Sequence, residues 1–131
     1  MGQPAAKQGD QITAVDVHIL MIPTPGGPVP TPIKHPFNGI IDHSLSTNVK
    51  IMGLPAATAG SMATNTPAHM PLGSGPFQKP PTNKGEILAG SLRVRINGKA
   101  AARNGDPAQT CQDPTPNLTG KVVAVGTVLI G

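Results

Sequence analysis

Three copies of one short glycine- and alanine-rich pattern organise this chain. They are GQPAAKQGD at residues 2–10, GLPAATAGS at 53–61 and GKAAARNGD at 98–106. Each copy has a glycine, two adjacent alanines three and four positions on, a second glycine, and then Asp or Ser. A pattern repeated at such intervals is typical of a fold made from copies of one small unit. The sequence therefore predicts three related units.

A short alternating segment precedes the second and third copies, and a similar segment ends the chain. These segments are NVKIMG (48–53), RVRING (93–98) and GTVLIG (126–131). Apolar and polar residues alternate in the first two, which is the period of a β-strand. We therefore expect a strand that leads directly into each repeat.

A second set of apolar segments lies further upstream and is expected to form the first strands of hairpins. The segments are NGIIDHS (38–44), KGEILAGS (84–91) and GKVVAVG (120–126), with tight turns near 42–46, 89–91 and 125–127. The C-terminal hairpin, 120–131, is expected to complete the unit that begins at Gly2. The prediction is a single domain, residues 1–131, with repeat units at roughly 2–18, 38–69 and 84–111.

Proline and glycine, sixteen of each among 131 residues, argue against helices throughout. The proline-rich segments 21–37 and 70–84 are expected to be long, extended, ordered loops, because proline lowers the entropy lost on ordering. Flexible linkers are the alternative. Charged residues make up only 12% of the chain, which argues against general disorder. The expected class is all-β, with short strands.

Each repeat is followed by one residue that can bind a soft metal ion. His18 and His69 each lie nine positions after the second glycine of their copy, and Cys111 lies six positions after it. If three units surround one axis, these ligands converge on it. Structural zinc prefers four nitrogen and sulfur ligands. His35, in a proline-braced segment, is preferred as the fourth over His43, which falls in a predicted hairpin turn.

Two catalytic functions are alternatives to a structural metal site. A zinc hydrolase needs an open metal position and a nearby carboxylate base, for which Asp16 is the best candidate. A cysteine nucleophile needs a base that a third group orients, but His18 and His69 are assigned to the metal. The remaining aspartates are expected in turns or turn caps; they are Asp10, Asp42, Asp106 and Asp113.

The charge pattern and the N-terminus restrict partners and location. Net charge is +4, but the basic residues are scattered, so nucleic-acid binding is not expected. A lone cysteine cannot form an internal disulfide, and the N-terminus has no apolar signal core. The longest apolar run, VHILMIP, is too short for a membrane helix. The protein is expected to begin in the cytoplasm.

The segment VRINGKAAARNGD (94–106) resembles the strand-turn-strand signature of the PAAR-repeat proteins, a family named for Pro-Ala-Ala-Arg. The chain reads Pro-Ala-Ala-Lys at 4–7, Pro-Ala-Ala-Thr at 55–58 and Ala-Ala-Ala-Arg at 100–103. The resemblance covers essentially the whole chain and rests on repetition. The departures at Lys7, Thr58 and Ala100 leave open what the motif's Arg and Pro do here.

The resemblance implies a small β cone with pseudo-threefold symmetry, which is structural and not an enzyme. In the family, this cone caps and sharpens the trimeric spike of type VI secretion and related contractile injection systems and helps it pierce the target membrane. The implied partner is a trimeric VgrG-like spike protein at the cone base, with effector proteins as further candidates. A monomer of this kind stays cytoplasmic until assembly and is then translocated without a signal peptide.

Members of the family bind a structural zinc ion near the point through three histidines and one cysteine, with iron as the alternative metal. By register, that pattern matches His18, His69 and Cys111, and it makes His35 the expected fourth ligand.

Overall fold

The computed structural model describes residues 2–131, and within them the protein is all-β, as the sequence predicts, with no helix. No helix within these residues is therefore long and apolar enough to cross a membrane. The strands are β1 (Gln3–Pro4), β2 (Gln11–Ile22), β3 (Val29–His43), β4 (Lys50–Ile51), β5 (Leu54–Pro55), β6 (Met62–Asn65), β7 (Lys84–Ile87), β8 (Arg95–Ile96), β9 (Lys99–Ala100), β10 (Pro107–Thr110), β11 (Asn117–Val123) and β12 (Leu129–Ile130).

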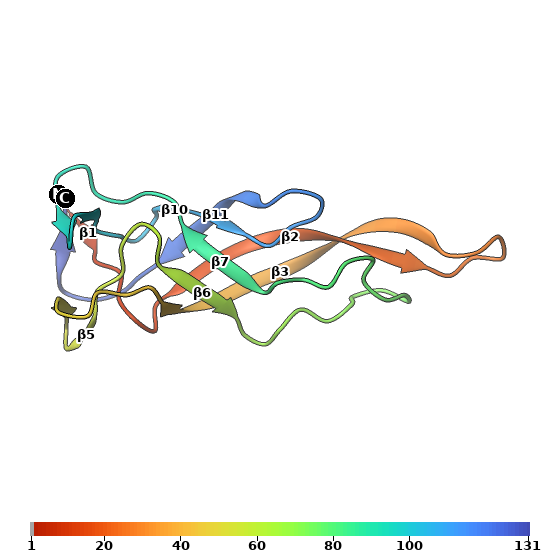
Figure 1. The fold of residues 1–131 in the computed structure, drawn as a ribbon, viewed down its shortest axis with the longest axis horizontal. Helices are drawn as coiled ribbons and strands as arrows, with labels where there is room; N and C mark the ends of the chain where they lie inside the picture. The colour runs from red at the N-terminus through yellow and green to blue at the C-terminus, as the bar shows by residue number, and fades with distance from the viewer. Residues whose placement is uncertain (1) are drawn as a thin grey trace.

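Six strands close into an antiparallel barrel in the order β10-β11-β2-β3-β6-β7. The longest pair is β2 with β3, which run side by side from Gln11↔Ile40 to Ile22↔Val29. This hairpin continues well past the other barrel strands and forms one end of an elongated molecule (Figure 1). We call it the long hairpin.

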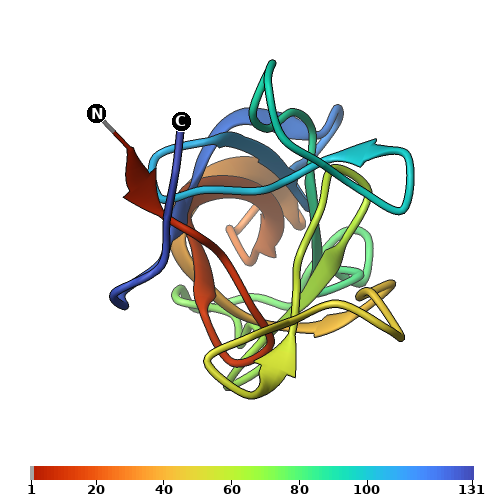
Figure 2. The same cartoon turned by 90° about the vertical axis from the view of Figure 1, so that its left-hand side faces the viewer.

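Three two-stranded ribbons, β1-β12, β4-β5 and β8-β9, form the opposite end. Figure 2 looks at this end and shows the ribbons set around the barrel. Met52-Gly53 and Asn97-Gly98 close two of them, and all four residues have positive φ, as a two-residue type I′ turn requires. The third ribbon pairs Gln3 with Ile130 and so joins segments from the two ends of the chain.

The predicted hairpin partners are wrong. β3 pairs with β2 and β6, and β7 pairs with β6 and β10, whereas the ribbon strands β4 and β8 pair with β5 and β9. A two-residue period predicts a strand but not the edge with which it pairs. Here each upstream strand finds both partners in the barrel, while the glycine turn folds the next strand back on the repeat.

The expected loop at 21–37 is also wrong, because β2 and β3 pair across most of it. Its paired prolines, Pro30, Pro32 and Pro36, all occupy even positions of β3, so their nitrogens face the same side. Proline can occupy a strand when its missing N–H faces away from the pairing partner. The segment between β6 and β7, residues 66–83, forms no named strand, but Phe77 bridges to Leu20 on β2.

Equivalent residues of the three copies form the core in layers. One buried cluster lies at the ribbon end and contains the first alanine of each copy and one isoleucine from each ribbon: Ala5, Ala56, Ala101, Ile51, Ile96 and Ile130. The other fills the barrel and includes the second alanine of each copy: Ala6, Ala57 and Ala102. Small side chains let three backbones approach closely, and Phe37 is the only aromatic residue in the barrel cluster.

The three inner alanines are joined by a closed cycle of backbone hydrogen bonds. The Ala6 N–H donates to the Ala102 carbonyl (2.9 Å), Ala57 donates to Ala6 (3.0 Å), and Ala102 donates to Ala57 (3.1 Å). Each copy therefore donates to one neighbour and accepts from the other. The cycle satisfies three buried N–H groups and three buried carbonyl groups, none of which belongs to a strand.

The residue after each alanine pair is held by the Asp or Ser that follows the second glycine. A side-chain oxygen accepts the main-chain N–H three residues earlier in each copy; the pairs are Lys7–Asp10, Thr58–Ser61 and Arg103–Asp106. The predicted capping role of Asp10 and Asp106 is thus confirmed. The two also form ion pairs, Lys7 Nζ to Asp10 at 3.1 Å and Arg103 Nη2 to Asp106 at 2.8 Å.

Candidate metal centre

Four side chains that can bind a metal ion converge beside the barrel core, two of them from the long hairpin. Asp16 and His18 come from β2, His69 from the 66–83 segment, and Cys111 from the residue after β10. One ligand atom of each lies within 4.8 Å of every other. His18, His69 and Cys111 are the three predicted ligands that follow the repeats, and Asp16 is a fourth donor that the sequence does not predict as a ligand.

The strand geometry explains why Asp16 and His18 share the site. Residues two apart on a strand point to the same face, and here both side chains are buried, with 0% and 1% exposure. His69 is placed by a hydrogen bond from its N–H to Asn83 Oδ1 (2.8 Å). Cys111 follows Thr110, whose hydroxyl donates to Asp16.

The His18 ring is oriented by a carboxylate outside the cluster. Its Nδ1 lies 3.2 Å from Asp113 Oδ2, and its Nε2 faces Cys111 Sγ at 3.8 Å. A carboxylate that accepts from one ring nitrogen leaves the other nitrogen with its lone pair toward a metal, as is common in histidine metal sites. Asp113 is anchored by its own N–H, which donates to the Val17 carbonyl (2.9 Å).

The two oxygens of Asp16 have different surroundings. Oδ1 accepts hydrogen bonds from Thr110 Oγ1 and, at 3.3 Å, from Asn117 Nδ2. Oδ2 lies 3.4 Å from His69 Nε2 and 3.6 Å from Cys111 Sγ. One oxygen is thus held by the protein, while the other faces the donor atoms of the cluster.

Several donor separations are close to those around a tetrahedral ion. Zinc bonds of about 2.0 Å to nitrogen or oxygen and about 2.3 Å to sulfur imply tetrahedral edges of about 3.3 Å between nitrogen or oxygen donors and about 3.5 Å to the sulfur. Three of the six donor pairs in the cluster are separated by 3.4, 3.6 and 3.8 Å, and all six lie within 4.8 Å. Two imidazoles, a thiol and a carboxylate are also donors that zinc accepts. The residues present therefore fit a bound divalent metal.

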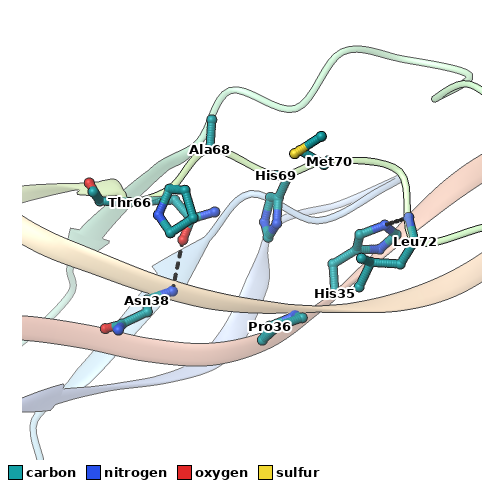
Figure 3. A pocket seen from close by; sticks show the side chains of 10 residues that line it. His35, Pro36, Asn38, Thr66, Ala68, His69, Met70 and Leu72 are labelled. Atoms are coloured by element: carbon teal, nitrogen blue, oxygen red, sulfur yellow. Dashed lines mark hydrogen bonds between the residues drawn. The ribbon is translucent and has the colours of Figure 1, made fainter.

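His35, the expected fourth ligand, lies beside the cluster. It sits opposite Asp16 in the β2–β3 register, with its ring 5.5 Å from that of His18 and 5.7 Å from that of His69. Its Nδ1 donates to the Ile33 carbonyl (2.9 Å), and its Nε2 accepts from the Leu72 N–H (3.2 Å; Figure 3). Burial lowers the pKa of His35, which agrees with a neutral ring that accepts at Nε2.

His43, the other candidate for the fourth position, is placed elsewhere. Its side chain is 65% exposed, and its Nδ1 lies 2.8 Å from Asp42. It does not belong to the cluster of four.

The protonation of Cys111 argues against a nucleophilic thiol. Burial, and then the nearby Asp16 carboxylate, raise the pKa of Cys111 to about 11. A catalytic thiol needs a lowered pKa. A metal ion would reverse this balance, because a coordinating thiol loses its proton to the cation.

A cavity of about 330 Å³ opens beside His35 and His69. Its lining is mostly apolar and includes Pro36, Met70 and Leu72 (Figure 3). None of its lining residues is an Asp or Glu. Asp16, the candidate base of the hydrolase alternative, does not line this cavity, but its Oδ2 lies 3.4 Å from Nε2 of the lining residue His69.

Two carboxylates of the site were not predicted in these positions. The sequence indicates Asp16 only as a base for hydrolysis and Asp113 only as a turn residue. Recognition of 11–22 as a strand would have placed Asp16 on the face of His18. For Asp113, no local signal exists, because its contact with His18 spans 95 residues of sequence.

Comparison with known proteins identifies no relative of this chain, so the interpretation of the site rests on the geometry of its side chains. No protein-family model matches the chain. No curated protein matches it significantly either.

Proposed function

We propose that this protein is a structural, metal-binding tip that caps the trimeric spike of a type VI secretion or related contractile injection apparatus. The observation that carries the proposal is the hydrogen-bond cycle of Ala6, Ala57 and Ala102. One chain with three equivalent units around a pseudo-threefold axis matches the end of a trimer, in which three identical surfaces surround the same axis. The resemblance of the repeats to PAAR proteins supports the same assignment.

The ribbon end is the docking face in this proposal and forms the base of the cone. Large apolar side chains are exposed there, including Met52 (53%), Leu54 (40%) and Leu129 (60%). The ribbon strands also carry basic residues and no Asp or Glu; these are Lys50, Arg95 and Lys99. An apolar surface that also carries positive charge fits a partner whose end offers apolar and acidic residues.

The opposite end of the molecule, which the long hairpin forms, has the low charge and exposed apolar side chains that suit entry into a membrane. Residues 17–33 and 62–78 contain no Asp, Glu, Lys or Arg. Met70 and Leu72 are exposed there, at 72% and 58%. The prolines of the long hairpin reduce the number of N–H donors along its open edges, and unpaired donors are costly in hydrocarbon. These features support contact with a target membrane.

The cluster of four then serves as a structural metal site that stabilises the narrow part of the cone. A structural metal contributes folding free energy directly, where few large apolar side chains are available. Before assembly, the protein is a cytoplasmic monomer; it leaves the cell with the spike and can carry effector proteins.

Binding to a purified trimeric spike protein of such an apparatus tests the proposal. Size-exclusion chromatography with light scattering should give one copy of this chain per trimer. Met52→Asp should weaken binding at least about tenfold, because it buries a charge in the docking face. Val15→Asp, at a 57% exposed site on β2, is the matched control and should bind normally. No complex, or three copies per trimer, would overturn the proposal.

A further inference from the structure

We infer that Asp16, rather than His35, supplies the fourth metal ligand, and that His35 instead fastens the segment around Leu72 over the site. This inference rests on the metal-binding role proposed above. It departs from the three-histidine, one-cysteine set that the family resemblance implies.

The first argument is that the two carboxylate oxygens of Asp16 have different contacts. Oδ1 is occupied by Thr110 and Asn117, which fix the orientation of the carboxylate. Oδ2 lies between His69 Nε2 and Cys111 Sγ, at separations of a tetrahedral edge. Metal-binding carboxylates are commonly held in this way, with one oxygen hydrogen-bonded to the protein and the other on the ion.

The second argument is electrostatic. Asp16 is fully buried, and among the described residues 2–131 it has no lysine or arginine partner; its one ion-pair contact is His69. A buried carboxylate without a cation is strongly disfavoured. A divalent ion bound by the Asp16 carboxylate, the Cys111 thiolate and two neutral imidazoles is uncharged overall, so the ion supplies the missing positive charge.

The third argument concerns His35, because both of its ring nitrogens already have partners. Coordination through Nε2 would release the Leu72 N–H, and coordination through Nδ1 would release the Ile33 carbonyl. Neither ring nitrogen belongs to the group whose donor atoms lie within 4.8 Å. The Leu72 bond explains the burial of His35 without a metal, since it ties the 66–83 segment to β3.

An X-ray absorption spectrum of the protein, purified without chelators, at the edge of its bound metal tests the ligand set directly. The expected first shell has one sulfur, two imidazole nitrogens and one oxygen. A shell with one sulfur and three imidazoles would overturn the inference and leave the proposed metal-binding tip intact. Protein without metal, which also fails to take up added Zn²⁺ or Co²⁺, would overturn both.

Two matched variants give an independent readout through competition with a chromophoric chelator. Asp16→Asn keeps an oxygen that can accept from Thr110 but removes the charge, so zinc affinity should fall at least about tenfold. His35→Gln should change zinc affinity less than about threefold, and it should speed proteolysis near Leu72. The Co²⁺ form of His35→Gln should keep the tetrahedral absorption bands of the unmodified protein. Loss of metal in His35→Gln with full retention in Asp16→Asn would overturn the inference.

Discussion

The Phe37 ring fills the space beside Gly39 in the barrel, and the energetic coupling of these two positions can be measured. Phe37 is 2% exposed on β3, and its ring centroid lies 6.0 Å from that of His69, so it separates the barrel core from the metal cluster. A Cβ on Gly39 would lie 2.7 Å from Phe37 Cε1 and 2.9 Å from Ala63 Cβ. Neither neighbour has free space, because both are buried.

Gly39→Ala should therefore lower the free energy of unfolding by about 1–3 kcal/mol through overpacking. Phe37→Ala should lower it by about 3–5 kcal/mol through lost burial and the cavity left behind. The double variant should be less destabilised than the sum by about 1–2 kcal/mol. The removed ring leaves room for the new methyl group, and only the contact with Ala63 remains close.

Urea unfolding followed by far-ultraviolet circular dichroism measures these values, since the chain has no Trp or Tyr for fluorescence. Gly26→Ala is the control, because only Thr24 Oγ1 lies within 4 Å of the added Cβ, at 4.0 Å. It should leave stability almost unchanged. Additive effects in the double variant, within about 0.5 kcal/mol, would refute the packing argument.

Three further predictions concern the long hairpin and the metal cluster. A Cβ on residue 75 would collide with the Met21 carbonyl oxygen, so Gly75→Ala should detach the 66–83 segment from β2 and speed amide exchange at Met21. Unchanged exchange at Met21 would contradict this close approach. Asp113→Asn should lower zinc affinity by about 10- to 100-fold, because the carboxylate orients His18; an unchanged chelator titration would exclude this role. Burial raises the pKa of Cys111 to about 11 from 9.0, so the metal-free folded protein retains a proton that the unfolded chain loses. Its free energy of unfolding should therefore fall as the pH rises from about 9 to 11, and urea unfolding of Cys111→Ser should lack this component.

The sequence predicts the all-β class correctly, because the signals for strands and turns are local. An all-β chain follows from alternating strands, prolines and glycine turns, and the residues after each repeat glycine include three of the four clustered donors. Strand partners did not follow, because the pairing of β3 with β2 and β6 depends on closure of the barrel. A count of prolines likewise suggested a loop at 21–37, where their spacing permits a strand.

The two carboxylates of the site also show that local sequence patterns do not predict contacts made by the folded chain. Asp16 shares a strand face with His18, which a correct strand assignment would have revealed. Asp113 reaches His18 only through the folding of residues far apart in sequence. The sequence predicts His35 as the fourth metal ligand, whereas its hydrogen bond to the Leu72 N–H depends on a segment whose path no periodicity predicts.

Native mass spectrometry of this chain mixed with a trimeric spike protein tests the central proposal most directly. The account predicts one complex that contains one copy of this chain, three spike subunits and one divalent metal ion. The ion should remain with this chain when the complex is dissociated in the gas phase. Absence of any complex, or a complex with three copies of this chain per trimer, would contradict it.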